Sequence, residues 1–179
     1  MTLRVRDALP GDAGACAQIY AAYVRDTTIT FELDAPGDDE MAQRIGRAHS
    51  EYEWLVLEDE SGVIVGYAYA TEFKSRAAYQ WSVETSVYLD RARHRTGGGR
   101  LLYTELLSRL ARRGFRRVFA GVTQPNQASM AFHAAFGFEP AGLFRRVGFK
   151  HGSWHDVAWL QLDLLAPEDE IDPPRPVTP

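Results

Sequence analysis

The sequence is poor in cysteine and lacks long apolar runs. Cys16 is its one cysteine, so no disulfide can form within the chain, which suits the reducing cytoplasm. No apolar run approaches the roughly 18 residues of a membrane-spanning helix. The first residues lack the apolar core of a secretory signal. These absences predict a cytoplasmic protein that does not cross a membrane.

The chain has no excess of positive charge. Its 20 Lys and Arg against 24 Asp and Glu give a formal net charge of −4, which argues against a general nucleic-acid-binding protein. The charge is unevenly distributed, because residues 1–90 sum to −9 and residues 91–117 to +8. The second stretch is a candidate site for a phosphorylated ligand, whereas the acidic first half would repel nucleic acid.

Length and composition predict one folded domain. The chain has 179 residues, of which 45% are hydrophobic and 25% charged, as is ordinary for a globular protein. Residues 166–179 contain five prolines and four acidic residues, a composition that cannot build a core. We therefore expect a domain over residues 1–165 and a disordered C-terminal tail over residues 166–179.

Hydrophobic periodicity indicates both strands and helices. Apolar residues at every second position predict strands, and Leu102, Leu106 and Leu110, spaced by four, predict an amphipathic helix. The order is mixed α/β without regular strand–helix alternation, which excludes a TIM barrel and a simple Rossmann fold. The expected strands are residues 3–9, 54–58, 63–71, 79–89, 118–122, 145–150 and 156–164, the expected helices are residues 15–24, 38–50, 100–113 and 127–136, and residues 26–34 are a loop or a short strand.

A glycine-rich segment, Gly97-Gly98-Gly99, lies between an expected strand and an expected helix. Glycines let the backbone approach a ligand closely, and a helix N-terminus offers free N–H groups and a partial positive charge. The segment therefore predicts a phosphate site, with a flexible turn as the alternative. It is not a P-loop, because no Lys follows the glycines, and its spacing differs from the dinucleotide-binding fingerprint.

The residues around this loop resemble the GNAT acyltransferase superfamily. The similar motif is His94-Arg95-Thr96-Gly97-Gly98-Gly99, followed by Asn126 and then Phe136-Gly137-Phe138. It departs from the superfamily at His94, where Gln or Arg is usual. A closer similarity, to the phosphinothricin N-acetyltransferase family, covers nearly the whole chain and is most specific in the stretch GFKHGSWHDV, residues 148–157. The segments that carry this similarity are residues 24–28, 52–56, 66–70, 74–79, 84–88, 148–157 and 173–177.

The resemblance implies a fold and a reaction. It implies one GNAT domain of the α/β (α+β) class, whose mixed and largely antiparallel central sheet is flanked by helices. It also implies acetyl-CoA as the acetyl donor, no metal, and a homodimer. The acceptor would be the α-amine of a small amino-acid-like molecule, such as phosphinothricin or methionine sulfoximine.

Acetyl transfer to an α-amine requires a base, because the ammonium form dominates at pH 7. Glu84 is the predicted base, since the resembled family places its catalytic carboxylate on this strand and an apolar setting would raise the pKa. The alternative is an exposed strand glutamate. His133 stands where GNAT enzymes often place a tyrosine that protonates the leaving thiolate, and the alternative for His133 is a packed helix residue.

The resemblance also assigns binding residues for the donor. Backbone groups of Val87, Tyr88 and Leu89 would bind the pantetheine arm and polarise the thioester. Asn126 would bind the same arm, with a plain helix cap as the alternative. The residues predicted to bind the pyrophosphate are Arg95, Thr96, Gly97, Gly98, Gly99 and Arg100.

The predicted acceptor pocket combines cations with aromatic rings. The resemblance implies acceptor binding at Lys74, Arg76 and Tyr79, which precede the predicted catalytic strand, and the cations suit a carboxylate or a phosphinate. Phe31 would form an aromatic wall. Solvated or packed side chains are the alternative for each of these residues. Lys150 and His155, in the C-terminal motif, are open between structural, dimer-contact and acceptor-binding roles.

Two other functions stay open. One is a protein or peptide N-terminal acetyltransferase on the same scaffold, although the short charged segments 27–32 and 74–79 suit a compact acidic acceptor better. The other is a non-catalytic protein that binds CoA or another polyanion through the arginine-rich segment. Turnover of different acceptors would separate the three.

Overall fold

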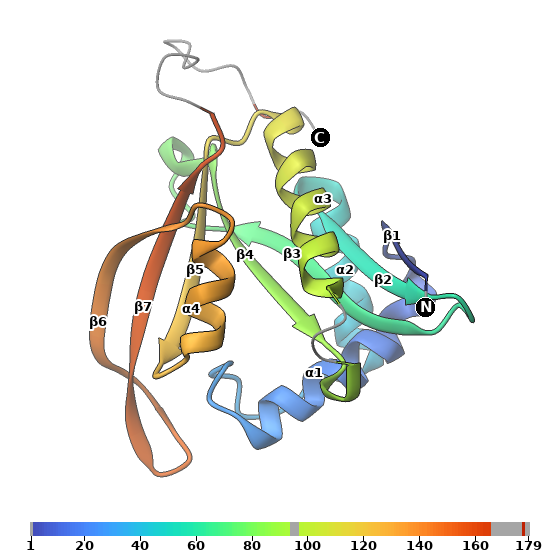
Figure 1. Ribbon diagram of the computed structural model, residues 1–179, viewed down its shortest axis with the longest axis horizontal. Coiled ribbons are helices and arrows are strands. Elements are labelled where there is room, and N and C mark those ends of the chain that lie inside the picture. Colours follow the sequence, from blue (N-terminus) through green and yellow to red (C-terminus); the bar gives the residue numbers. More distant parts are fainter. Residues whose placement is uncertain (1, 94–96, 166–176, 178–179) are drawn as a thin grey trace.

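The computed structural model describes residues 2–93, 97–165 and 177 (Figure 1). Seven strands form one sheet in the order β1-β2-β3-β4-β5-β7-β6, and all neighbours are antiparallel except the parallel pair β4 and β5. The predicted fold, a mixed and largely antiparallel sheet flanked by helices, is confirmed. The strands are β1 (Leu3–Asp7), β2 (Trp54–Asp59), β3 (Ile64–Glu72), β4 (Ser82–Leu89), β5 (Arg117–Gln124), β6 (Glu139–Lys150) and β7 (Ser153–Asp163), and the helices are α1 (Ala13–Asp26), α2 (Asp38–Glu51), α3 (Gly98–Arg113) and α4 (Gln127–Ala134).

The elements lie where periodicity predicts them, with differences at their ends. Asp26 ends α1, and residues 27–34, from the segment predicted as a loop or a short strand, form a loop without a strand between α1 and α2. β4 begins at Ser82 rather than at residue 79, because Ala77–Tyr79 form a short 3₁₀ turn, η2. β6 begins six residues earlier than predicted, at Glu139. Its early part contains Pro140, which an edge strand such as β6 tolerates and a central strand does not.

The predicted tail lies almost wholly outside the described residues. Val177 is described, and its partly buried side chain packs against the core on the α3 side of the sheet. The domain boundary at residue 165 therefore stays a prediction.

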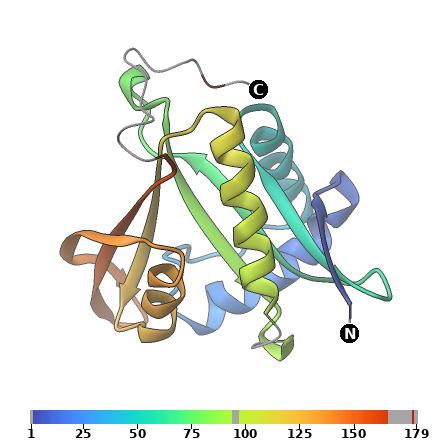
Figure 2. The ribbon, with the colours of Figure 1, turned by 45° about the horizontal axis from the view of Figure 1, so that its top comes forward.

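Helices cover both faces of the sheet (Figures 1 and 2). On one face, α1 and α2 bury residues such as Met41 and Ile45 against Tyr67 of β3. On the other face, α3 buries its predicted leucine stripe, which includes Leu102 and Leu106, and α4 adds partly buried rings. The sheet is thus enclosed between two separate hydrophobic cores, which fix the position of its central strands.

The parallel strands β4 and β5 pair over a short distance. Residues Ser82 to Glu84 pair with Arg117 to Phe119, and beyond these the strands separate into the V that Figure 1 shows between them. Backbone N–H and C=O groups in a sheet normally pair with the neighbouring strand. In the described structure, β4 beyond Glu84 has no partner strand on its β5 side, so this edge is available to a ligand.

Candidate active site

Glu84 lines a cavity of about 450 Å³, here called the Glu84 cavity, where β4 and β5 part. The cavity opens on the sheet face that α1 covers, because Glu84 alternates along β4 with Thr85, which contacts Tyr103 of α3. Glu84 is the only charged side chain among the described residues of its lining. The other lining residues are Tyr20, Ile29, Thr30, Phe31, Tyr69, Ser86, Tyr88, Gly121, Thr123, Phe144, Val147, Val157 and Trp159.

The surroundings of Glu84 change its acidity. Burial raises the pKa of its carboxyl above the ordinary value, and the nearby charge of Lys74 lowers it by less. The side chain is half-buried, so the predicted apolar setting is present. A carboxylate whose pKa lies closer to neutral pH is better matched to removing a proton from an ammonium group.

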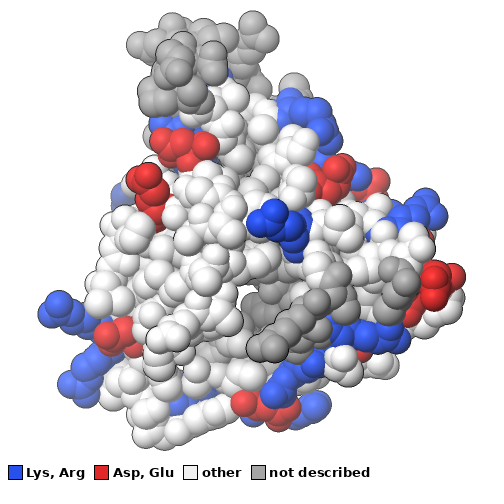
Figure 3. Space-filling view, viewed as in Figure 1, with Lys and Arg blue, Asp and Glu red and all other residues white. Residues whose placement is uncertain are grey.

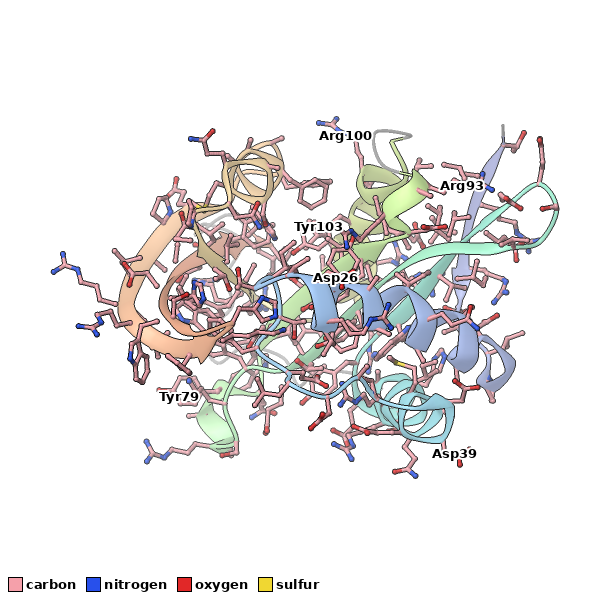
Figure 4. All side chains as sticks on the ribbon, turned by 90° about the horizontal axis from the view of Figure 1, so that it is seen from below. Asp26, Asp39, Tyr79, Arg93, Arg100 and Tyr103 are labelled. Atoms are coloured by element: carbon pink, nitrogen blue, oxygen red, sulfur yellow. The ribbon has the colours of Figure 1, made fainter. Side chains whose placement is uncertain are left out.

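The structure brings only part of the predicted acceptor pocket to Glu84. Phe31 lines the Glu84 cavity. Lys74, Arg76 and Tyr79 line a different hollow of about 310 Å³ beside η2, and Figure 4 shows Tyr79 at the edge of the molecule there. Lys74 still acts on Glu84 through its charge. Acceptor binding by these three residues stays a prediction.

The predicted phosphate loop ends on the N-terminus of α3. Gly97 has a left-handed backbone (φ +80°) that glycine adopts without strain, and Gly98 and Gly99 are buried in the first turn. A Cβ at residue 99 would lie 3.4 Å from the ring of Phe132, so the small residue also lets α3 and α4 pack closely. The first N–H groups of a helix have no partner within it, so this end can bind an anion.

Positive charge lies next to this helix end. Arg100 is exposed, extends away from α3 in Figure 4, and has its guanidinium 5.8 Å from the ring centroid of Phe136. Figure 3 views the molecule from the same side as Figure 1 and shows a hollow near the centre of that face, with Lys or Arg side chains above and below it. Arg95 and Thr96, also predicted to bind pyrophosphate, lie outside the described residues.

Several arginines of residues 91–117 pair with protein carboxylates. Arg91 lies 2.9 Å from Asp26, and Arg117 lies 3.0 Å from Asp163. Arg109 contacts Asp7. The sum of +8 therefore overstates the charge that this segment can offer to a ligand.

The residues predicted to bind pantetheine form the end of β4. There β3 pairs with β4 on one side, and in the described structure no strand pairs with it on the β5 side. Val87, Tyr88 and Leu89 pair with β3 on one side. The carbonyl of Leu89 accepts a hydrogen bond from the hydroxyl of Tyr23 at 2.7 Å. This contact occupies the Leu89 carbonyl, so a ligand on the β5 side would bind backbone groups earlier in this part of β4. The Tyr88 side chain is buried against α1, so any donor contact there would be made by backbone.

Asn126 caps α4. Its Oδ1 accepts a hydrogen bond from the Ser129 N–H at 3.0 Å, which confirms the helix-cap alternative. It also lines a cavity of about 420 Å³ with Thr123 and residues 26–29. The cap uses the amide oxygen and leaves the amide N–H groups for a ligand, so a contact with pantetheine stays a prediction.

His133 is buried and does not line the Glu84 cavity. Its Nδ1 lies 2.8 Å from the Ser129 carbonyl, which can only accept, so Nδ1 carries the proton. Its Nε2 then accepts from the Tyr103 hydroxyl at 3.2 Å. Burial lowers the pKa of His133, and the bond to Ser129 raises it by less. A neutral imidazole with both nitrogens occupied favours the packed-residue alternative over the predicted proton donor.

The hairpin β6–β7 supplies a wall that the sequence did not show. Phe144, Val147, Val157 and Trp159 line the Glu84 cavity from strands that follow Glu84 by 60 residues or more. No local sequence pattern predicts such a contact between distant segments. The one signal was the specific stretch of residues 148–157, whose role the sequence left open.

No metal centre is visible in the described part of the chain: none of its His, Cys, Asp and Glu side chains form a group of three or more placed to hold an ion. No helix of that part is long and apolar enough to cross a membrane. A carboxylate of raised pKa near one end of β4, and the N-terminus of α3 close to Leu89 at its other end, suit proton removal beside a phosphorylated ligand.

Known proteins are similar to this chain in sequence and in fold. The family described as "Acetyltransferase (GNAT) domain" matches residues 5–159. The phosphinothricin N-acetyltransferase of Streptomyces viridochromogenes is 38% identical over 177 residues, which cover 99% of this chain and 94% of that protein. The L-methionine sulfoximine/L-methionine sulfone acetyltransferase of Salmonella typhimurium is 33% identical, over 92% of this chain and 95% of that protein.

A solved structure agrees with these sequences. A phosphinothricin acetyltransferase from Sinorhizobium meliloti, in complex with AcCoA, superposes with a TM-score of 0.87 at 38% identity, over 91% of this chain and 89% of that one. This chain therefore belongs to the GNAT acetyltransferase family. Within that family, the three relatives described above are named as acetyltransferases of phosphinothricin or of L-methionine sulfoximine and L-methionine sulfone.

Proposed function

We propose that this protein transfers the acetyl group of acetyl-CoA to the α-amine of a small amino-acid-like acceptor, with Glu84 as the general base. The observation that carries the proposal is the position of Glu84, a half-buried carboxylate of raised pKa at the point where β4 and β5 part. Its cavity of about 450 Å³ is in the range of small-molecule sites. Relatives that act on phosphinothricin and on methionine sulfoximine support this acceptor class.

The proposed donor site runs along β4 to the start of α3. The pyrophosphate binds the N–H groups of Gly97 to Gly99, together with Arg100 and the loop before it. The pantetheine arm follows the open edge of Val87 to Leu89, with Asn126 on its other side. This path brings the thioester to the opening between β4 and β5, beside Glu84. The AcCoA complex of the Sinorhizobium relative supports acetyl-CoA as the donor.

The reaction balances with one base. Glu84 removes a proton from the α-ammonium, and the free amine attacks the thioester carbonyl carbon, so that a C–N bond forms. Backbone N–H groups of the open β4 edge stabilise the oxyanion. The tetrahedral intermediate collapses with cleavage of the C–S bond, and one of the two protons left on nitrogen passes to the departing sulfur, so that the amide keeps one N–H. The products are the N-acetylated acceptor and CoA thiol.

The proposed acceptor lies between Glu84 and the aromatic wall that includes Phe31. Lys74 and Arg76 would attract its carboxylate, or a phosphinate, from the neighbouring hollow. The lining of the Glu84 cavity is mainly aromatic and aliphatic, which suits the hydrocarbon part of an amino-acid side chain.

We also propose a homodimer built on β6, in the cytoplasm where Cys16 stays reduced. β6 is an edge strand and exposes Leu143, Val147 and Phe149 along its length. An exposed apolar edge is an aggregation hazard unless another chain covers it. A second copy can cover it by two-fold symmetry. Val147→Lys should give a monomer in sedimentation, while Val63→Lys, at an exposed site far from β6, should not.

One experiment tests the function. Purified protein and acetyl-CoA are given phosphinothricin, methionine sulfoximine, methionine sulfone and short peptides, and thiol release is followed with mass analysis of the acceptor. Turnover of an amino-acid analogue supports the proposal. Turnover of peptides alone makes the protein an N-terminal acetyltransferase. Saturable CoA binding with no turnover makes it a non-catalytic binder.

A further inference from the structure

Lys150 is almost fully buried, at 3% exposure, near the end of β6. A buried ammonium group is costly unless hydrogen bonds replace its water. Its Nζ donates to the backbone carbonyl of Thr30 at 2.8 Å, across 120 residues of sequence. Burial lowers the pKa of Lys150, and the charge of Glu32 raises it by less. Lys150 therefore fastens the end of β6 to the loop that carries Phe31.

Gly148, two residues before Lys150 on β6, contacts the same loop. A Cβ at residue 148 would lie 2.2 Å from the ring of Phe31, a distance that real atoms do not reach. The ring therefore lies directly against the Gly148 backbone, and any larger residue would displace it. Gly148 is required here by packing rather than by its backbone conformation.

His155 completes this contact from β7. Its Nε2 lies 3.0 Å from the Lys150 carbonyl, which ties the two strands together at the end of the hairpin. Its ring lies 6.2 Å from the ring of Phe31. Two residues of the stretch 148–157, Gly148 and His155, thus lie beside the Phe31 ring.

The helices hold the other side of the loop. The hydroxyls of Tyr20 and Thr30 are 2.6 Å apart, and Arg44 of α2 pairs with Glu32 at 2.7 Å. Thr30 is therefore bound through its side chain by α1 and through its carbonyl by Lys150. Phe31 lies in the sequence between Thr30 and Glu32, both of which are held by these contacts, and it lines the Glu84 cavity.

We infer that Gly148 and Lys150 are positioning residues, which hold Phe31 as a fixed wall of the Glu84 cavity and so set the size of the acceptor side chain that fits. This inference rests on the proposed function of that cavity. It gives the hairpin motif a role in acceptor selection, without contact between Lys150 and the acceptor. It also requires that both residues act through Phe31.

A double-mutant cycle tests that requirement. We expect Gly148→Ala and Lys150→Met each to raise the acceptor KM by about tenfold and to leave the acetyl-CoA KM within about twofold, as for coupled neighbours. In a Phe31→Ala background, both effects should vanish. Gly142→Ala is the matched control, because it lies on the same strand with open space around it. Losses of equal size in the presence and absence of the Phe31 ring would overturn the inference.

A second readout does not depend on turnover. Backbone amides of residues 27–33 should exchange with deuterium faster in Lys150→Met and Gly148→Ala than in the wild type, and at the wild-type rate in Gly142→Ala. Unchanged exchange in both variants would overturn the inference even if activity is lost. If the wild type acetylates none of the acceptors, the proposed function fails, and exchange alone still decides whether the hairpin holds the loop.

Discussion

Glu84 and Phe119 form the last pair of the parallel ladder between β4 and β5. The carboxylate of Glu84 faces the cavity under α1, and the backbone that follows it on β4 has lost its β5 partner in the described structure. The position of the proposed base and the open edge proposed for the donor are thus consequences of one feature, a ladder that ends after three pairs. Their separation is fixed by a single extended strand, which is stiffer than a loop.

Replacing Glu84, the proposed base, should remove most of the activity. Glu84→Gln keeps the size of the side chain and removes its ability to accept a proton, so we expect kcat/KM for the acceptor to fall by about 10²–10⁴. The loss should shrink at alkaline pH, where the acceptor amine is already deprotonated. Thiol release measured across pH checks this. Glu60→Gln, in the exposed turn between β2 and β3, is the control, and an equal loss there would refute the assignment.

The raised pKa of Glu84 also predicts a pH-dependent stability. Folding disfavours the charged carboxylate, so the folded protein loses stability as pH rises from about 4.3, the ordinary glutamate pKa, through the raised folded value. The amide of the Glu84→Gln variant is neutral throughout and escapes this loss. We expect that variant to have the larger free energy of unfolding at pH 8 and nearly the wild-type value at pH 4. Denaturant unfolding at both pH values measures this, and a difference that grows toward acid would contradict it.

Arg100 should contribute to donor affinity and not to acceptor affinity. Removing one charge-assisted contact to a phosphate costs about 1.5–3 kcal/mol, so we expect Arg100→Ala to raise the Kd for CoA by about 10- to 100-fold. The effect should decrease at high salt. Arg112→Ala, exposed near the other end of α3, is the control. Calorimetric titration with CoA measures both variants, and equal losses would mean that Arg100 has no specific contact.

Most of the fold could be predicted because its signals are local. The leucine stripe of α3 and the alternation in the strands are properties of short segments, and the structure confirms them. The early part of β6 was missed because Pro140 and Gly142 resemble turn residues. They are tolerated there because, among the strands of the described residues, β6 pairs with β7 alone.

The candidate site could be predicted only in part. Glu84 and the glycine loop lie close together in the sequence, so their order along the site can be predicted without knowing how distant segments pack. The proposed acceptor pocket depends on contacts between distant segments: Phe31 lines the same cavity as Glu84, whereas Lys74 and Arg76 line another hollow. The hairpin wall depends on the pairing of β7 with β5, which no single stretch of sequence encodes.

The contacts of His133 predict a role in stability rather than in proton donation. His133→Ala leaves the buried Tyr103 hydroxyl without the Nε2 acceptor, and Tyr103→Phe removes that hydroxyl. The Tyr103 hydroxyl still has the Thr85 hydroxyl as a partner at 2.6 Å, so each variant loses at least one buried hydrogen bond, worth about 0.5–1.5 kcal/mol, and we expect each to lower the free energy of unfolding by about that amount or more. Because they break the same bond, the double variant should lose less than the sum of the two. Denaturant unfolding measures all three.

The same variants decide whether His133 takes part in catalysis. If Nε2 only accepts from Tyr103, kcat of the folded His133→Ala enzyme should stay within about threefold of the wild type, since a general acid is worth about 10²–10⁴. A fall of that larger size, with an unchanged free energy of unfolding, would establish His133 as the donor. Tyr103→Phe separates the cases further, because it keeps the imidazole and removes only its hydrogen-bond partner. A catalytic role for His133 alone predicts nearly wild-type stability in this variant, whereas a structural pair predicts a lower free energy of unfolding.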